Sequence, residues 1–185
     1  MFIEDGKGKG TLSEVSEDNR IHTSARSNDR IYYVSRDNGK AFVVNFSGEQ
    51  ATGGTTQGLG YIQYTGNDKL YINSVSVLTE EDNGLTKFGI QTNPTVAAGV
   101  DAQVTTMNLT SNEISETTSK DDDDGTGVTI TGGVSVGSVR LNDEGTYQVD
   151  FDDALILGKN DILAITMNAA TTGTKCRAFI RYFEE

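Results

Sequence analysis

The sequence predicts an all-β fold, an antiparallel β-sandwich that we expect to be a jelly roll, with an extended N-terminal arm. The apolar residues gather in short runs rich in Val, Ile, Tyr and Phe, which suit strands. Turn-forming stretches with Gly, Asn or Asp separate these runs, and the chain has 21 glycines but a single proline. About nine or ten such strands predict a sandwich, and about eight in two antiparallel sheets make a jelly roll.

Residues 1–28 are predicted to form the arm. This stretch is polar, alternates Gly with Lys from Gly6 to Gly10, and places its apolar residues with no period of 2 or 3.6. We expect the arm to be disordered in the free protein and to order on contact with another surface. Residues 29–185 are predicted to form one sandwich domain, because a chain of 185 residues is long enough for one sizeable core.

The first half of the domain is predicted to form β-hairpins. Runs at 31–34 and 41–46 flank Asn38-Gly39, a pair that favours a hairpin turn. A Gly- and Thr-rich loop at 47–58 is followed by a strand at 61–64, which we expect to meet 70–72 across a turn at 66–68. The strand at 70–79, a charged turn at 80–84 and a strand at 85–92 come next, and Asn93-Pro94 ends the last of these.

The second half supplies the remaining strands. We expect a loop from residue 95 and then a strand at 104–109, although the alanines there would also suit a short helix. Strands follow at 128–130 and 134–141, and 147–151 alternates apolar and polar residues as a half-buried strand does. Residues 162–167 are apolar on both faces, which predicts a strand inside a sheet. The last strand, 176–183, places Cys176, Ala178, Ile180 and Tyr182 on one side.

Charge and composition exclude several classes of partner. With 27 acidic and 15 basic residues the net charge is −12, which repels nucleic acid and anionic membranes alike. No stretch approaches the roughly 20 apolar residues of a membrane span. The opening Met1 to Asp5 lacks the pattern of a signal peptide, so we expect the protein to be made in the cytoplasm and kept in solution.

The sequence offers no catalytic or cofactor-binding residue, so we expect no enzyme. The one histidine, His22, lies in the arm, and the one cysteine, Cys176, has the apolar neighbours of a buried hydrophobe. The glycines at 6–10 fit no phosphate-binding motif. Gly58-Leu59-Gly60 and the glycines at 125 and 127 lack the third glycine of a nucleotide-binding loop, and we interpret them as turns.

The run Asp121, Asp122, Asp123 and Asp124 is the strongest candidate for a metal site. Clustered carboxylates can hold Ca²⁺ through six to eight oxygens, but the ligand spacing of an EF-hand is absent here. We expect a solvated acidic loop and assign no metal ligand, with a weak calcium site as the open alternative.

Several motifs carry a resemblance to known proteins. They are Ile3-Glu4-Asp5-Gly6-Lys7-Gly8-Lys9-Gly10, Asn19-Arg20-Ile21, the stretch 31–39, Asn93-Pro94-Thr95, Met107-Asn108-Leu109 and the stretch 155–161. In this order they resemble a group of tailed-bacteriophage structural proteins whose N-terminal arm reads I-E-D-G-x-G-x-G. The resemblance touches both ends and the middle of the chain. It implies a virion component of β-sandwich type and carries over no catalytic or binding residue.

The sequence and the resemblance together predict a non-enzymatic bacteriophage virion protein. We expect a capsid decoration or stabilisation protein that docks on the major capsid protein, or on another virion protein, through its arm and sandwich. A homo-oligomer, with a homotrimer favoured, would cover the exposed sheet edges. The alternative is a tail- or fibre-associated domain that binds host-surface glycans, for which Tyr61, Tyr64 and Tyr71 would supply a stacking platform.

Overall fold

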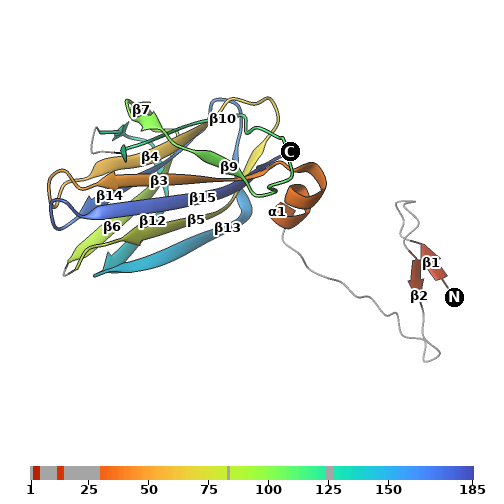
Figure 1. Cartoon of the computed structure of the whole chain (residues 1–185), viewed down its shortest axis with the longest axis horizontal. Coiled ribbons are helices and arrows are strands. Elements are labelled where there is room, and N and C mark those ends of the chain that lie inside the picture. Colours follow the sequence, from red (N-terminus) through yellow and green to blue (C-terminus); the bar gives the residue numbers. More distant parts are fainter. Residues whose placement is uncertain (1, 5–11, 15–29, 83, 124–126) are drawn as a thin grey trace.

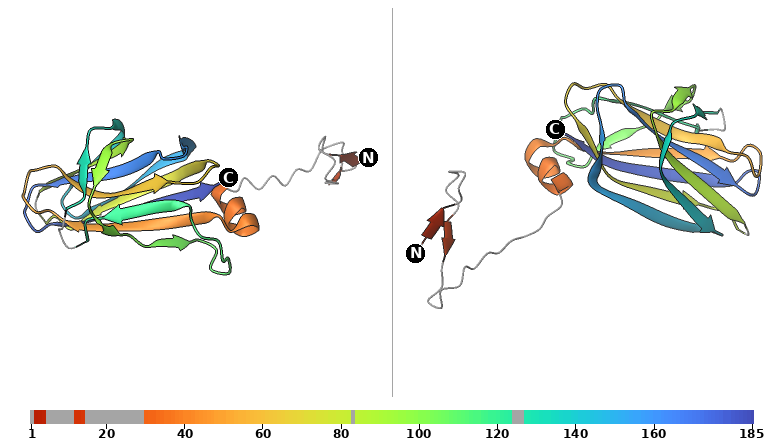
Figure 2. Two further views of the ribbon diagram at one scale, coloured as in Figure 1. Left: turned by 90° about the horizontal axis from the view of Figure 1, so that it is seen from above. Right: turned by 180° about the vertical axis from the view of Figure 1, so that it is seen from behind.

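The computed structural model describes residues 2–4, 12–14, 30–82, 84–123 and 127–185. Within the predicted arm, β1 (Phe2–Glu4) and β2 (Leu12–Glu14) pair in antiparallel fashion, and the other residues of 1–28 lie outside the described residues. From Arg30 onward the chain forms two large antiparallel sheets packed face to face, together with a small two-stranded sheet (Figures 1 and 2). The prediction of an all-β sandwich is therefore confirmed.

Two short helical segments precede the sandwich, α1 (Arg30–Tyr33) and the π-helical η1 (Val34–Asn38). The strands of the sandwich are β3 (Ala41–Glu49), β4 (Gln57–Tyr64), β5 (Leu70–Thr79), β6 (Leu85–Thr92), β7 (Thr95–Ala97), β8 (Val100–Asp101), β9 (Val104–Thr106), β10 (Thr117–Asp121), β11 (Thr129–Thr131), β12 (Val134–Asn142), β13 (Gly145–Leu157), β14 (Ile162–Ala169) and β15 (Lys175–Glu184).

The sheets are built from nested pairs of strands. The five-stranded sheet has the order β13-β5-β15-β3-β9, and the six-stranded sheet has the order β12-β6-β14-β4-β10-β8. Within them β3 pairs with β15, β4 with β14, β5 with β13 and β6 with β12. The chain thus runs out and back as one long hairpin, whose successive pairs alternate between the two sheets. The segment between β6 and β12 adds β9 beside β3 and β10 beside β4.

The core lies between the sheets, and the alternation of side chains along each strand determines which of them are buried there. Along β15 the side chains of Cys176, Ala178, Ile180 and Tyr182 are fully buried, as predicted. The strand β14 lies between β4 and β6, so the prediction of an interior strand at 162–167 is also confirmed. Its Ala164 packs outside the main core, together with Tyr61 and Val128.

The predicted first strand at 31–34 is wrong, because these residues form α1 and the start of η1. Ile31 and Val34, three residues apart, share one helix face and pack against Ala41 and Phe183. A short apolar run fits a helical turn as well as a strand. Gly39 then ends the helical segment with a φ of +68°, so Asn38-Gly39 stops a helix rather than forming a hairpin.

Three further predictions need correction. The strands β4 and β5 do not pair, because the turn between them carries the chain from one sheet to the other. Gly58 and Gly60 lie within β4 rather than in a turn. At Gly60 a Cβ atom would come 2.5 Å from Cγ of Phe46, so the close approach of β3 and β4 requires a glycine there. The segment after residue 94 contains β7, β8 and β9 in place of one loop and one strand.

Candidate protein-binding surfaces

The loop at 107–116, which connects β9 to β10, exposes large apolar side chains. Leu109 and Ile114 are each 86% exposed, and Met107 on the same loop is 42% exposed. We call these three residues the apolar loop. Figures 1 and 2 place this loop beside α1 at the end of the sandwich where the described domain begins. Leu109 and Ile114 are the most exposed of the large apolar side chains in the described part of the chain, and both come from one loop, which makes this loop a candidate site of contact with another molecule.

Hydrogen bonds of Asn108 hold the first half of the apolar loop. Its amide nitrogen Nδ2 donates to the carbonyl oxygen of Ser35 at 3.0 Å, which ties the loop to η1. Its Oδ1 accepts from the main-chain N–H of Thr110 at 3.1 Å and from the Thr110 hydroxyl at 2.7 Å. Asn108 thus closes a local turn directly beside Leu109.

The second half of the loop is fixed to the last strand. The buried carboxylate of Glu184 accepts hydrogen bonds from the Ser115 hydroxyl at 2.7 Å and from the main-chain N–H of Glu116 at 3.0 Å. The hydroxyl groups of Ser115 and Tyr182 lie 2.8 Å apart. Burial raises the pKa of the Glu184 carboxyl and raises the pKa of Tyr182 to about 12. The loop that displays Ile114 is therefore anchored in the interior.

A cleft of about 600 Å³ lies between this loop and the neighbouring strands. Its lining combines polar residues, among them Asp101, Gln103 and Glu113, with the apolar residues Phe42, Val104 and Ile114. Asp101 at its rim forms an ion pair with Lys120 at 2.7 Å. Lining of this kind suits water or a small ligand with both hydroxyl and apolar groups.

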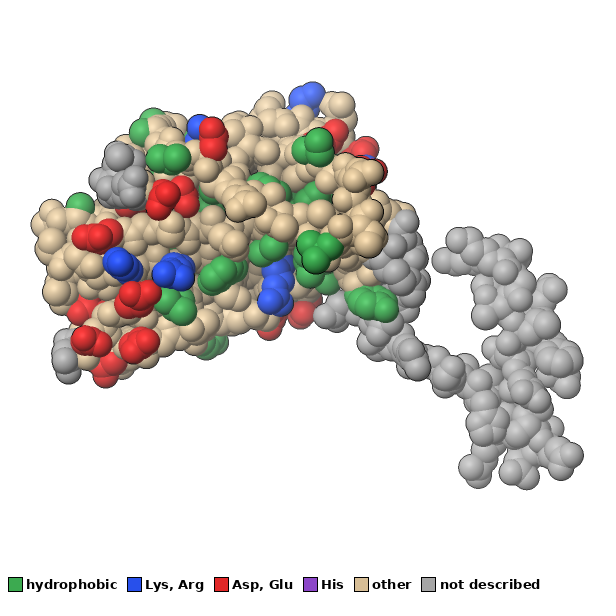
Figure 3. Space-filling model, viewed as in Figure 1, with side chains coloured by type: hydrophobic (Ala, Val, Ile, Leu, Met, Phe, Trp, Pro, Cys, Tyr) green, Lys and Arg blue, Asp and Glu red, His purple; other side chains and the backbone are tan. Residues whose placement is uncertain are grey.

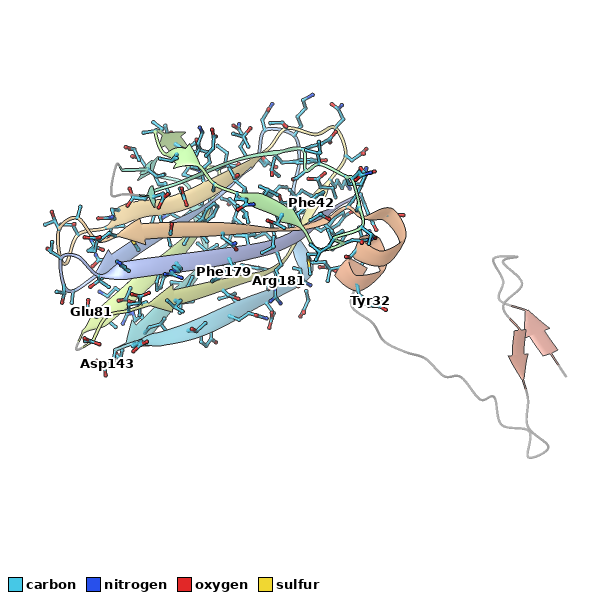
Figure 4. All side chains as sticks on the ribbon, viewed as in Figure 1. Tyr32, Phe42, Glu81, Asp143, Phe179 and Arg181 are labelled. Carbon is cyan, nitrogen blue, oxygen red and sulfur yellow. The ribbon has the colours of Figure 1, made fainter. Side chains whose placement is uncertain are left out.

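The outer face of the five-stranded sheet carries a row of basic and aromatic side chains with acidic ones around it. Along β15 the outward side chains are Lys175, Arg177, Phe179 and Arg181, and we call this set the arginine face. Figure 4 shows Phe179 and Arg181 on the near side of the sheet, and Figure 3 shows basic, acidic and apolar side chains mixed across that side. Arg177 lies 3.6 Å from Glu80, whereas Arg181 has no ion-pair partner among the described residues.

The other feature of this sheet is its acidic edge, formed by Asp150, Asp152 and Asp153 of β13. The pairing with β5 is interrupted between Asp150 and Leu155, and Asp152 and Asp153 there have positive φ angles of 47° and 61°. Asp153 accepts a hydrogen bond from the Asn73 amide at 3.3 Å. A bulge and clustered charges on an edge strand prevent direct pairing with another strand.

The expectation of a solvated acidic loop is wrong for Asp121 and Asp122, which are both buried. Asp121 ends β10 and accepts from the main-chain N–H of Ser47 at 3.2 Å, and Asp122 accepts from that of Gly127 at 2.6 Å. Burial raises the pKa of both carboxyl groups. Asp123 is exposed and Asp124 lies outside the described residues. Among the described residues no group of three or more His, Cys, Asp or Glu could hold a metal ion.

The other residues singled out from the sequence do not converge on a site. Cys176 is buried as predicted, and burial raises the pKa of its thiol to about 11. Tyr61 and Tyr64 are buried, and Tyr71 stacks on Phe183 with ring centres 5.0 Å apart. The tyrosine platform suggested for glycan stacking is therefore not formed by these residues. His22 and the glycines at 6–10 lie outside the described residues.

Comparisons with known proteins identify no relative. No family model matches the chain, and the searches of curated proteins and of solved structures found no match. Among the described residues no helix is long and apolar enough to cross a membrane.

Proposed function

We propose that this chain is a non-enzymatic structural protein of a bacteriophage virion, a decoration subunit that docks on the capsid shell. The observation that carries the proposal is the apolar loop, whose exposed side chains lie on a segment that hydrogen bonds of Asn108 and Glu184 fix to the domain. Because the backbone of the loop is fixed before any partner arrives, less conformational entropy is lost when a partner covers it.

The energy available from this surface fits a weak contact repeated many times. Full burial of one Leu or Ile side chain contributes roughly 1.5–3 kcal/mol. Leu109 and Ile114 together would contribute about 3–6 kcal/mol, less the cost of association. A decoration subunit with several copies of this contact would bind far more tightly than one copy. The described domain begins at α1, which lies beside the loop, and the predicted arm precedes α1 in the sequence, so the arm would add contact area on the same shell.

The strand order gives the proposal further support. The outermost of the nested pairs is β3 with β15, and the innermost is β6 with β12. This order agrees with that of a jelly roll. We propose this fold for the chain, and jelly rolls occur in viral capsid proteins as well as in lectins and cupins. The fold alone does not decide among these functions. The glycan-binding alternative loses support because Tyr61 and Tyr64 are buried.

Electron microscopy of purified particles with and without the protein tests the proposal. The expected result is added density on the head, and density on the tail or on neither would contradict it. Binding to particles that lack the protein should then be measured by co-sedimentation for the double variant Leu109→Ser, Ile114→Ser. Val134→Ser is a matched control, because Val134 is another exposed apolar residue and lies on β12. We expect binding to be lost in the double variant and kept in the control, and equal binding by both would refute the role of the loop.

A further inference from the structure

We propose that two copies of this chain associate through the edge strand β12, which pairs in antiparallel fashion with β12 of the second copy about a two-fold axis. The two six-stranded sheets would then form one continuous sheet. This inference goes beyond the proposed function and uses a surface other than the apolar loop, so contact with a shell and contact between copies can be tested separately.

The strand β12 is a long edge without the usual protection. The edge strands of the two large sheets are β13 and β9 in one and β12 and β8 in the other. β8 and β9 have only two and three residues, and β13 carries the bulge and the acidic edge. β12 has nine residues with no Asp, Glu or Pro, and in the described part of the chain it pairs with β6 alone. Its outer row of main-chain N–H and C=O groups therefore suits another strand.

The sandwich is also open on the side of β12. Tyr147 of β13 lies opposite Val77 of β5, so both side chains are on the inner face, yet Val77 is fully buried and Tyr147 is 54% exposed. Leu141 of β12 and Val149 of β13 pack against the core but are only partly buried. Because β12 and β13 lie along the same side of the sandwich (Figure 1), a second copy at this edge would cover these side chains.

The sequence of β12 permits pairing with itself. Facing residues of an antiparallel pair lie on the same side of a sheet, so the two-fold axis must pass through a residue. The pairing of β12 with β6 shifts register between residues 135 and 137 and is regular from there to the end of the strand, so the axis belongs in this second part. An axis at Val139 gives these pairs: Val139 with its own copy, Gly137 with Leu141, and Ser138 with Arg140.

Charge selects this axis and a second copy. Arg140 is the one charged residue of β12, and an axis through it would place two guanidinium groups opposite each other. The axis at Val139 instead places Arg140 opposite the uncharged Ser138. Each copy has a net charge of −12, so two copies approach with least repulsion along a long edge that has no carboxylate. The contact is isologous and therefore closes at two copies, which is the commonest symmetry of homo-oligomers.

The acidic edge makes the contact sensitive to salt in a defined direction. Because β13 lies on the same side of the sandwich as β12, the axis also brings the carboxylates of Asp150, Asp152 and Asp153 nearer to those of the second copy. Added salt screens this repulsion, so it should strengthen the association. A contact held by ion pairs would weaken under the same conditions.

Light scattering coupled to size-exclusion chromatography of the full chain, at several protein and salt concentrations, tests the contact. We expect a dimer for the wild type. Ser138→Lys should weaken it by roughly threefold to tenfold, because each new lysine faces Arg140 of the other copy, and Ser138→Glu should strengthen it by a similar factor. A contact governed by net charge would give the opposite order, because each copy is acidic.

Matched controls come from the same sheet. Thr118 is exposed on β10, away from the β12 edge, so Thr118→Lys and Thr118→Glu change the charge equally and should not reproduce the effects of the Ser138 pair. Ser138 is also exposed, so its variants leave the core unchanged. Circular dichroism and urea unfolding of each variant establish that it folds.

The outcomes separate this contact from the proposed function. A wild type that is monomeric at every concentration or trimeric, a dimer that salt weakens, or Ser138 variants that follow net charge overturn the inference. If the wild type is monomeric and Ser138→Lys abolishes particle binding, the edge serves the shell and the second copy is refuted. If a monomeric wild type binds particles and loses this binding in Leu109→Ser, Ile114→Ser, the proposed function stands and only the contact between copies is refuted.

Discussion

Replacement of Glu81 by alanine should lower the free energy of unfolding by about 3 kcal/mol at neutral pH. Glu81 lies in the turn between β5 and β6 and is only 4% exposed. Its carboxylate accepts from the hydroxyl of Thr171 at 2.6 Å, from the hydroxyl of Thr174 at 2.7 Å and from the main-chain N–H of Thr171 at 3.1 Å. These bonds join the β5–β6 turn to the β14–β15 turn.

The magnitude follows from the exposure of the three donors. A hydrogen bond to a charged group contributes roughly 1.5–3 kcal/mol, and a buried donor without a partner is costly. Thr174 is buried, so the loss of its acceptor should cost about 2 kcal/mol. Thr171 is exposed, so water replaces the carboxylate and each of its two bonds should cost about 0.5 kcal/mol.

The effect of Glu81 should depend on pH in a defined direction. The hydrogen bonds from Thr171 and Thr174 lower the pKa of the Glu81 carboxyl below its ordinary value of 4.5. A lowered folded-state pKa means that the stabilisation is complete above the unfolded pKa and is lost as pH falls through the folded value. The difference between wild type and Glu81→Ala should therefore shrink in acid.

Urea unfolding of both proteins, at neutral pH and in acid, measures these quantities. Glu80→Ala is the control, because the exposed Glu80 carboxylate forms an ion pair with Arg177 at 3.6 Å, and the loss of such a surface pair should cost less than about 1 kcal/mol. The reasoning is refuted if Glu81→Ala costs no more than this control, or if its effect is the same at both pH values.

Three other predictions concern the interior. Gly60→Ala should destabilise the fold by about 1–3 kcal/mol in urea unfolding because its methyl group would meet the Phe46 ring, whereas Gly145→Ala, with open space around it, should be nearly neutral. Millimolar calcium at constant ionic strength should leave the melting temperature unchanged, because the buried Asp122 carboxylate already accepts from main-chain and side-chain donors; a large rise would reveal a metal site. The thiol of Cys176, buried and with a pKa of about 11, should react with a thiol reagent far more slowly in the native protein than in urea, and equal rates would contradict its burial.

The strands that were predicted correctly are those with a long, regular pattern. The ranges 70–79 and 85–92 match β5 and β6, because the alternation of side chains and the flanking turns are both local signals. The run at 31–34 was too short to distinguish a strand from a helical turn. The pairing of β4 with β14 could not be predicted either, because it joins residues about a hundred positions apart and leaves no local signal in the sequence.

The candidate surfaces were less predictable than the fold. Leu109 was expected to end a strand, and nothing in the sequence separates an exposed Leu109 or Ile114 from a buried one. Glu81 lies in the segment 80–84, for which the sequence predicted a charged turn and nothing about burial. Its burial depends on Thr171 and Thr174, which are about ninety positions later in the chain. The alternation along 176–183 correctly separated Arg177, Phe179 and Arg181 from the buried side of β15, but Phe183, which the same alternation places with them, is buried.

The nested strand pairs have a consequence for how the chain folds. Because β3 pairs with β15, the first long strand of the sandwich and the last one lie side by side within the five-stranded sheet. During synthesis β3 therefore remains without this neighbour until the residues of β15 have also left the ribosome. Contacts between such distant segments slow folding, since the loop between them must close before the pairing stabilises it. Removal of residues 175–184 would take away a central strand, so β3 and β5 would each have one newly exposed, aggregation-prone edge.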